Sequence, residues 1–290
     1  MSVPLLMSKM GGMPDLQDLR RKAELFRQLH QGPRILVLPN AWDCASARLF
    51  EEAGFPAIAT TSAGIAFTLG YPDGERISRD EMLAVAGRIA AAVSVPVTAD
   101  VEAGYGDAAA TAAGVIESGA VGLNLEDARG DGSLVDVGEQ CERIRTVRRT
   151  GLRSGVHLVI NARCDMYLNG IGEPADRFEG SIERLRRYVD AGADCLFVPG
   201  VTDAALISRL VEALQFPLNI LAGPGAPPAP RLEALGVARL SVGSGIMRAT
   251  MGLTRRIARE LRGTGEYGSM TEAAVPYAEA TRMFPSRADR

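Results

Sequence analysis

The hydrophobic positions of this chain fall into short apolar runs that alternate with longer amphipathic stretches. Within a run, successive residues are apolar, which is typical of strands buried on both faces of a parallel sheet. The pattern predicts eight strands, at Ile35–Leu38, Ala57–Thr60, Val97–Asp100, Gly122–Leu125, Leu158–Asn161, Cys195–Val198, Leu218–Leu221 and Arg239–Val242.

The stretches between these strands carry apolar residues at helical spacing, and several of them end at a glycine, as helix C-caps do. A leading helix is expected at Leu16–Gln31 and a weaker tail helix at Thr271–Arg282. The helices expected between them are Cys44–Ala53, Arg79–Val93, Ala108–Glu117, Val137–Arg149, Ala175–Ala191, Asp203–Ala213, Pro230–Leu235 and Gly245–Arg262.

Eight units of a strand followed by a helix predict an α/β fold, a (β/α)8 TIM barrel with an extra N-terminal helix. The alternative is an open doubly wound sheet, whose first strand more often leads into a glycine-rich nucleotide turn. Here the first strand leads into the segment 39–43, which reads PNAWD. We expect one barrel domain over 1–290, with 264–290 as a C-terminal helical tail. Since such a tail commonly packs on a neighbouring subunit, we also expect a homo-oligomer.

The composition excludes several kinds of partner. The 290 residues include 32 Lys and Arg and 35 Asp and Glu, a formal net charge of −3, which argues against nucleic acid. The arginine clusters at 143–149 and 184–187 are interpreted as solvated helix faces. No apolar run approaches the roughly 20 residues of a membrane helix, and the first residues do not resemble a secretory signal. We therefore expect a cytoplasmic protein that binds neither nucleic acid nor membrane.

The cysteines and histidines favour a hard cation over zinc. The chain has four cysteines, none in a Cys-x-x-Cys pair, and two histidines. A Cys/His zinc site is therefore not expected, and any metal should be held by oxygen ligands. We expect His30 to be solvated in the leading helix, His157 to lie at the end of the barrel away from the chemistry, and Cys164 to lie in the core.

Carboxylates gather where the predicted strands end, which in a TIM barrel is the face that carries the active site. Asp100 and Glu102 are two residues apart and point to the same side of an extended chain, and Glu126 ends the next strand. Such carboxylates repel one another unless a cation neutralises them, and their oxygens suit Mg²⁺ or Mn²⁺. The alternative interpretation is that these acids cap helices.

Two further features near the strand ends fit an anionic substrate. Arg163 has a guanidinium fork that can hold a carboxylate, although it could instead pair with Asp165 or Glu126 in a structural ion pair. Small residues at 62–64 let backbone N–H groups approach an anion, although such runs are also plain turns.

Five segments carry a resemblance to a known family. They occur in order between about Arg34 and Gly245 and read LPNAWDCASARLFEEAGFPAIATTSAGIAFTLGYPDGE, PVTADVEAGYGD, GLNLEDA, INARCDMYL and LFVPG. On these motifs the chain resembles the isocitrate lyase/phosphoenolpyruvate mutase superfamily. The resemblance implies a (β/α)8 barrel, a final helix often exchanged between the subunits of a dimer or tetramer, Mg²⁺, and a small 2-oxo acid or its enolate.

The resemblance also implies roles for individual residues. The implied metal site consists of Asp100, Glu102 and Glu126. The implied substrate contacts are Arg163, the backbone of Ser62, Ala63 and Gly64, and, by a looser match, Asn219. Asp73 matches an aspartate near the metal waters, so the implied catalytic group is Asp73, Glu126 and Arg163.

The loop after Glu126 departs from the lyases of that superfamily. Those lyases carry K-[KR]-C-G-H there, with the cysteine as the acid, whereas residues 128–136 read ARGDGSLVD. The K-x-N-S loop of the mutases is absent as well, and Gly200 stands where the lyases have glutamate. The residues implied to bind the metal and stabilise an enolate are thus present. The residues that determine which bond is broken differ from those of the lyases and mutases.

The sequence predicts a Mg²⁺-dependent enzyme that acts on a small 2-oxo acid through a metal-stabilised enolate, as a C–C bond lyase or decarboxylase. One alternative is P–C bond chemistry of the phosphoenolpyruvate mutase or phosphonopyruvate hydrolase type. A second is a 2-oxo acid binding protein without catalysis. A third is an unrelated metal-dependent aldolase barrel, which would need a His or Lys base near the mouth.

Overall fold

The computed structural model describes residues 14–272 and 274–284. Its tertiary contacts divide into two compact units, one extending to Gly243 and one beginning at Ser244. The expected single domain with a tail over 264–290 stays a prediction.

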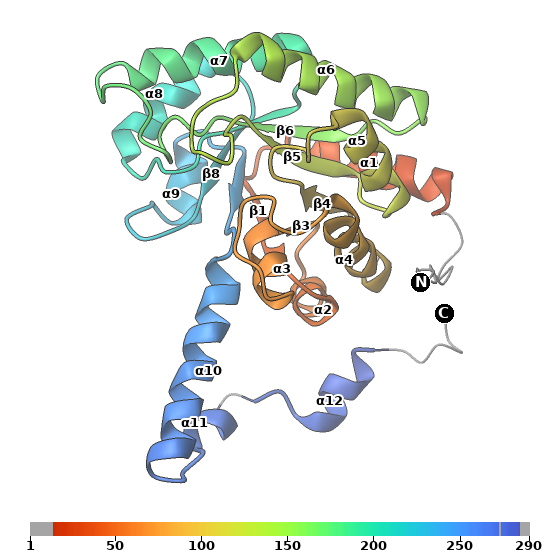
Figure 1. The fold of residues 1–290 in the computed structure, drawn as a ribbon, viewed down its shortest axis with the longest axis vertical. Helices are drawn as coiled ribbons and strands as arrows, with labels where there is room; N and C mark the ends of the chain where they lie inside the picture. The colour runs from red at the N-terminus through yellow and green to blue at the C-terminus, as the bar shows by residue number, and fades with distance from the viewer. Residues whose placement is uncertain (1–13, 273, 285–290) are drawn as a thin grey trace, which may run out of the picture. The chain divides into compact units, whose positions relative to one another are not determined.

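The first unit is a closed parallel barrel. Its strands pair in the order β1-β9-β8-β7-β6-β5-β4-β3-β2, and every pair is parallel. The end strands β1 (Leu36–Leu38) and β2 (Asn40–Ala41) are separated in sequence only by Pro39, which has no N–H to donate. Both ends of the sheet therefore belong to one interrupted strand, and the sheet closes on itself (Figure 1). This confirms the predicted TIM barrel and excludes the open doubly wound sheet.

The other strands are short and buried, as their apolar runs predict. They are β3 (Ile58–Thr60), β4 (Val97–Asp100), β5 (Gly122–Glu126), β6 (Val159–Arg163), β7 (Cys195–Phe197), β8 (Leu218–Leu221) and β9 (Arg239–Ser241). The helices around them are α2 (Cys44–Glu52), α3 (Ser62–Thr68), α4 (Arg79–Ala92), α5 (Ala108–Glu117), α6 (Val137–Arg153), α7 (Arg177–Ala191), α8 (Ala204–Leu214) and α9 (Ala229–Ala234) (Figure 1).

The predicted strands and barrel helices lie within two residues of the observed ones, apart from two differences. Helix α6 continues past the predicted end at Arg149 to Arg153. Helix α3 stands where no helix was predicted, because seven residues are too few to show helical periodicity. The hydroxyl of Thr61 caps it by accepting a hydrogen bond from the Gly64 amide at 3.3 Å.

Helix α1 (Leu16–Leu29) seals the end of the barrel where the strands begin. A Cβ atom added to Gly122, the first residue of β5, would lie 2.9 Å from the ring of Phe26. The expectation that His30 is solvated is wrong, since this residue is only 4% exposed. Its Nδ1 lies 2.8 Å from the Phe26 carbonyl and its Nε2 3.4 Å from Arg239 Nη1. The end of α1 is therefore packed on the barrel floor.

The second unit consists of α10 (Gly245–Gly263), α11 (Gly268–Thr271) and α12 (Tyr277–Arg282). The predicted helix over 271–282 is wrong in its first half, because 274–276 are not helical and residue 273 lies outside the described residues. Pro276 explains this difference, since it lacks an N–H and disfavours helical geometry at Val275. Among the described helices, none has the length and hydrophobicity needed to cross a membrane.

Candidate active site

The register of the parallel strands gathers charged residues at the C-terminal ends of β4, β5 and β6. Asp100 of β4 lies beside Asn124 of β5, and Glu126 of β5 lies beside Arg163 of β6. Since residues two apart on a strand share a face, Asn124 and Glu126 project to the same side. These residues are far apart along the chain, and the parallel pairing of β4, β5 and β6 makes them neighbours.

Asp100 is nearly buried, at 8% exposed, and two residues bind its carboxylate. Ser62 donates to Oδ2 through its amide and through its hydroxyl, both at 3.0 Å. Asn124 Nδ2 lies 3.5 Å from Oδ1. The same Ser62 hydroxyl lies 3.4 Å from Asp73 Oδ1, so the serine joins the two aspartates. The Ser62 amide, predicted to face a substrate, is thus directed at Asp100.

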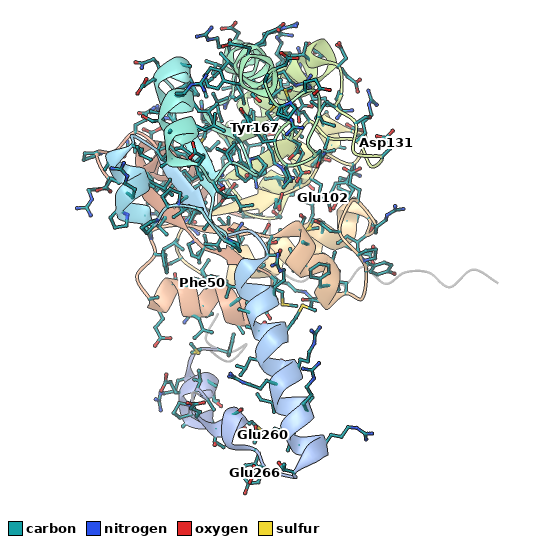
Figure 2. The ribbon with its side chains drawn as sticks, turned by 90° about the vertical axis from the view of Figure 1, so that its left-hand side faces the viewer. Phe50, Glu102, Asp131, Tyr167, Glu260 and Glu266 are labelled. Atoms are coloured by element: carbon teal, nitrogen blue, oxygen red, sulfur yellow. The ribbon has the colours of Figure 1, made fainter. Side chains whose placement is uncertain are left out.

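Glu102 follows β4 and is 5% exposed (Figure 2). Its carboxylate accepts hydrogen bonds from the Glu75 amide and, at 3.2 Å, from the Tyr105 hydroxyl. Burial, and then the charges of Asp100 and Asp73, raise the pKa of Glu102 to about 7. Burial and Asp100 likewise raise the pKa of Asp73. These acids therefore lie close enough to disfavour one another's ionised form.

Arg163 forms ion pairs with both partners that the sequence suggested. Its Nη1 donates to Glu126 and its Nε donates to Asp165 Oδ1 at 2.7 Å. Burial raises the pKa of Glu126 well above its usual value, although the Arg163 charge acts in the opposite direction. Burial by itself would lower the pKa of Arg163, but the charges of Glu126 and Asp165 raise it overall. Arg163 is therefore a fixed cation within a group of acids.

The fully buried Asp127 holds the Asp165 end of the ion pair between Arg163 and Asp165 in place. Asp127 accepts hydrogen bonds from the Asp165 amide at 2.9 Å, Arg184 Nε at 2.9 Å and the Tyr188 hydroxyl at 2.7 Å. Arg184 is therefore not on a solvated helix face, which corrects the interpretation of the 184–187 cluster for this residue, whereas Arg186 and Arg187 are exposed as expected. Arg184 lies four residues before Tyr188, so the two side chains share one face of α7. This spacing is the sequence signal that could have indicated the inward position of Arg184.

The remaining predicted residues lie apart from the acids or are already bonded. Asn219 on β8 is fully buried and exchanges hydrogen bonds with Ser241 of β9 at 3.2 and 3.3 Å. The Gly64 amide donates to its own helix cap, Thr61. As expected, Cys164 is buried in the core. Glu75 was not predicted at all, because its contact with Glu102 depends on backbone geometry that no motif encodes.

The acids offer oxygen donors for a divalent cation, but they do not form a closed ligand cage. Within 14–272 and 274–284, no three His, Cys, Asp or Glu side chains are arranged as a metal site. Burial first, and then the charges of neighbouring acids, raise the pKa values of Glu102 and Glu126, and a cation bound among these acids would offset both effects. This donor set fits Mg²⁺, which is usually held by few carboxylates together with water and substrate oxygens.

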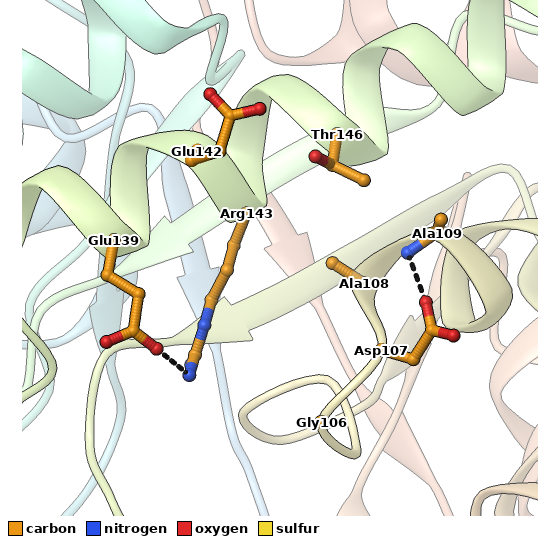
Figure 3. Close-up of a pocket in the computed structure, with 8 residues that line it drawn as sticks. All are labelled: Gly106, Asp107, Ala108, Ala109, Glu139, Glu142, Arg143 and Thr146. Atoms are coloured by element: carbon orange, nitrogen blue, oxygen red, sulfur yellow. Dashed lines mark hydrogen bonds and ion pairs between the residues drawn. The ribbon is translucent and has the colours of Figure 1, made fainter.

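A cavity of about 370 Å³ lies elsewhere, between the start of α5 and α6 (Figure 3). The helix amides there are already used, since Asp107 accepts from Ala109 and Ala110 at 3.1 and 3.0 Å. Arg143 is paired with Glu139 at 2.6 Å, and Glu142 adds further negative charge. This cavity therefore does not suit an anionic substrate.

A closed barrel with acids and a partly buried arginine at the C-terminal ends of its strands has the architecture of a TIM-barrel enzyme. The family model described as phosphoenolpyruvate phosphomutase matches residues 26–262. The chain belongs to this family, and it is an enzyme of the isocitrate lyase/phosphoenolpyruvate mutase superfamily.

Three relatives illustrate this membership. A structure from Burkholderia cenocepacia J2315, described as a lyase/mutase, has 40% identity and a TM-score of 0.86, covering 93% of this chain and 98% of that one. The 2-methylisocitrate lyase of Escherichia coli is 30% identical over 69% of this chain and 70% of its own. An oxaloacetate acetylhydrolase in complex with its product oxalate has 27% identity and a TM-score of 0.81, covering 90% of this chain and 93% of that one.

Proposed function

We propose that this enzyme breaks a C–C bond in a small 2-oxo acid, as a lyase or decarboxylase, with Mg²⁺ or Mn²⁺ as cofactor. The observation that carries this proposal is the meeting of Asp100, Glu102 and Glu126 with the partly buried Arg163 at the ends of β4–β6. Two of the relatives described above, 2-methylisocitrate lyase and oxaloacetate acetylhydrolase, support C–C chemistry by their names.

Asp100, Glu102 and Glu126 would hold the divalent cation. When bound, the cation supplies a Lewis acid next to the oxygens of the 2-oxo acid. Arg163 would bind the substrate carboxylate, because its planar fork matches a carboxylate in two parallel hydrogen bonds. Asp127 and Asp165 keep that fork in place, so its positive potential needs no reorganisation when negative charge develops on the substrate.

The loop over 128–136 contains neither the cysteine nor the histidine of the lyases. Decarboxylation and retro-aldol cleavage need little beyond an electron sink, which suits such a site. In the structure this loop is a short hairpin, with a bridge between Ala128 and Leu134, and Asn169 Nδ2 donates to Gly132 O at 3.2 Å. A loop of this kind could close over the substrate and exclude water.

P–C bond chemistry is the second candidate, favoured by the family model that the chain matches. A panel of oxaloacetate, 2-methylmalate-type acids and phosphonopyruvate, each with Mg²⁺ and assays for pyruvate, oxalate and phosphoenolpyruvate, separates the two. We expect turnover of a C–C substrate that EDTA abolishes and that Asp100→Ala lacks. Turnover of phosphonopyruvate alone, to pyruvate or to phosphoenolpyruvate, would favour the second candidate. Thermal stabilisation by these acids without any turnover would indicate a binding protein.

We also propose a cytoplasmic homo-oligomer that exchanges its C-terminal helices. Helix α10 supports this proposal, because it is amphipathic and none of its residues is buried within the described chain. Its apolar side chains include Met251, Leu253 and Leu261, which are 40–46% exposed.

A further inference from the structure

Backbone strain is concentrated next to Glu102. Only four non-glycine residues in the described ranges have a positive φ, and three of them contact one another: Glu75 (54°), Glu102 (51°) and Tyr105 (53°). Left-handed geometry is unfavourable for an L-residue, because its Cβ lies too close to the following carbonyl oxygen. Such strain persists only where surrounding contacts impose it, and it tends to accumulate at functional sites.

Three hydrogen bonds join these residues, which we call the Glu75 clasp. The Glu75 amide donates to Glu102 Oε2. The Tyr105 amide donates to Glu75 Oε1 at 2.7 Å, and the Tyr105 hydroxyl donates to Glu102 Oε1 at 3.2 Å. Glu75 thus uses its backbone to hold one carboxylate and its own carboxylate to hold the neighbouring loop.

The two segments joined by the clasp differ in how firmly they are anchored. The segment 102–106 is tied to the barrel, because the Glu126 amide donates to the Glu102 carbonyl at 2.9 Å. The Thr111 hydroxyl also donates to the Gly104 carbonyl at 2.8 Å. The loop 70–76 is exposed along its length, yet it carries Asp73. Two sets of hydrogen bonds connect this loop to the acidic residues of the site. One is the 3.4 Å contact between Ser62 and Asp73, and the other is the clasp.

We propose that Glu75 is a positioning residue that holds Asp73 and Glu102 in the active site by clasping the loop 70–76 to the segment 102–106. The inference rests on the proposed function, which gives these two carboxylates their roles. Glu75 itself does not reach the reacting groups, because its carboxylate is occupied by the Tyr105 amide. Losing that one contact frees the exposed loop, moves Asp73 away and removes a donor from Glu102.

The test compares Glu75→Ala, which deletes the contact, with Glu75→Gln, which keeps an acceptor oxygen at the same place. Glu52→Ala, on the exposed end of α2, is the control. We expect Glu75→Ala to weaken Mn²⁺ binding by calorimetry about tenfold, as outer-shell substitutions typically do. Amide hydrogen exchange in 70–76 and in 102–106 should accelerate together in this variant. Glu75→Gln should restore both, and Glu52→Ala should match the wild type.

Tyr105→Phe is a second variant, needed if Glu75→Ala does not fold. It keeps the packed ring and removes only the hydroxyl bond to Glu102, so Mn²⁺ should bind more weakly without faster exchange in 70–76. Wild-type Mn²⁺ affinity in Glu75→Ala, or faster exchange in 70–76 alone, overturns the inference. A wild type that takes up no Mn²⁺ overturns the proposed function instead. In that case hydrogen exchange alone tests the inference. If exchange in 70–76 and in 102–106 is the same in Glu75→Ala as in the wild type, the clasp is rejected.

Discussion

Burial governs how the charged residues of the site behave. Glu102 and Asp100 are at most 8% exposed, and the loss of hydration, followed by the charge of Asp100, raises the pKa of Glu102 to about 7. For Arg163, burial disfavours the charged form, but the charges of Glu126 and Asp165 outweigh burial and raise its pKa. The same arginine therefore supports the structure, and in the proposed function it also holds the substrate carboxylate.

Two substitutions separate these roles of Arg163. Arg163→Ala leaves Glu126 and Asp165 without their cation, and we expect it to lower the free energy of unfolding by about 3–5 kcal/mol. Arg163→Lys keeps the charge but loses the fork, so it should weaken binding of the 2-oxo acid about tenfold with a smaller loss of stability. Urea unfolding and calorimetric titration measure the two effects. Wild-type binding in both variants would reject Arg163 as the substrate contact.

At the scale of elements, α1 and the floor of the barrel form one buried polar contact. Arg239 is fully buried on β9, and its Nη1 lies near the neutral His30 ring. Burial, and then the Arg239 charge, lower the pKa of His30 to about 4. With Nδ1 donating to the Phe26 carbonyl, Nε2 is left as an acceptor for the arginine. Protonating His30 would place two cations together under the barrel.

This contact predicts a loss of stability in acid. The unfolded chain protonates His30 near the reference pKa of 6.5, whereas the folded chain resists until about 4. Between pH 7 and pH 5 the unfolded state therefore binds more protons, and the free energy of unfolding should fall by about 2 kcal/mol from this residue. His30→Gln should remove that part of the pH dependence in urea unfolding. A variant with the same slope as the wild type would show that His30 is not the titrating group.

At the scale of the whole molecule, the barrel and the C-terminal helices present different surfaces. The barrel buries nearly all of its apolar strand residues, whereas α10 is amphipathic and buries none of its own. A helix with an uncovered apolar face gains stability by packing on another surface. A second copy of this chain would supply such a surface if the helices were exchanged.

Light scattering after size exclusion tests this arrangement. We expect a mass that is a multiple of the 30.7 kDa chain. Leu253→Glu should shift the mass toward the monomer, because it places a charge on the apolar side of α10. Arg255→Gln, a substitution on the same helix, is the control and should leave the mass unchanged. A wild-type protein that elutes at the monomer mass would contradict the proposed assembly.

The sequence by itself determined the elements and the closed barrel, because apolar periodicity and helix caps act between residues close along the chain. Since strand ends meet at one face of any such barrel, it also indicated that Asp100, Glu126 and Arg163 would come together. Contacts between distant residues were decided only by the tertiary structure. Glu75 meets Glu102 because both adopt left-handed geometry, and His30 meets Arg239 because α1 folds under the barrel. Such contacts depend on how whole elements dock, and no local pattern records that docking.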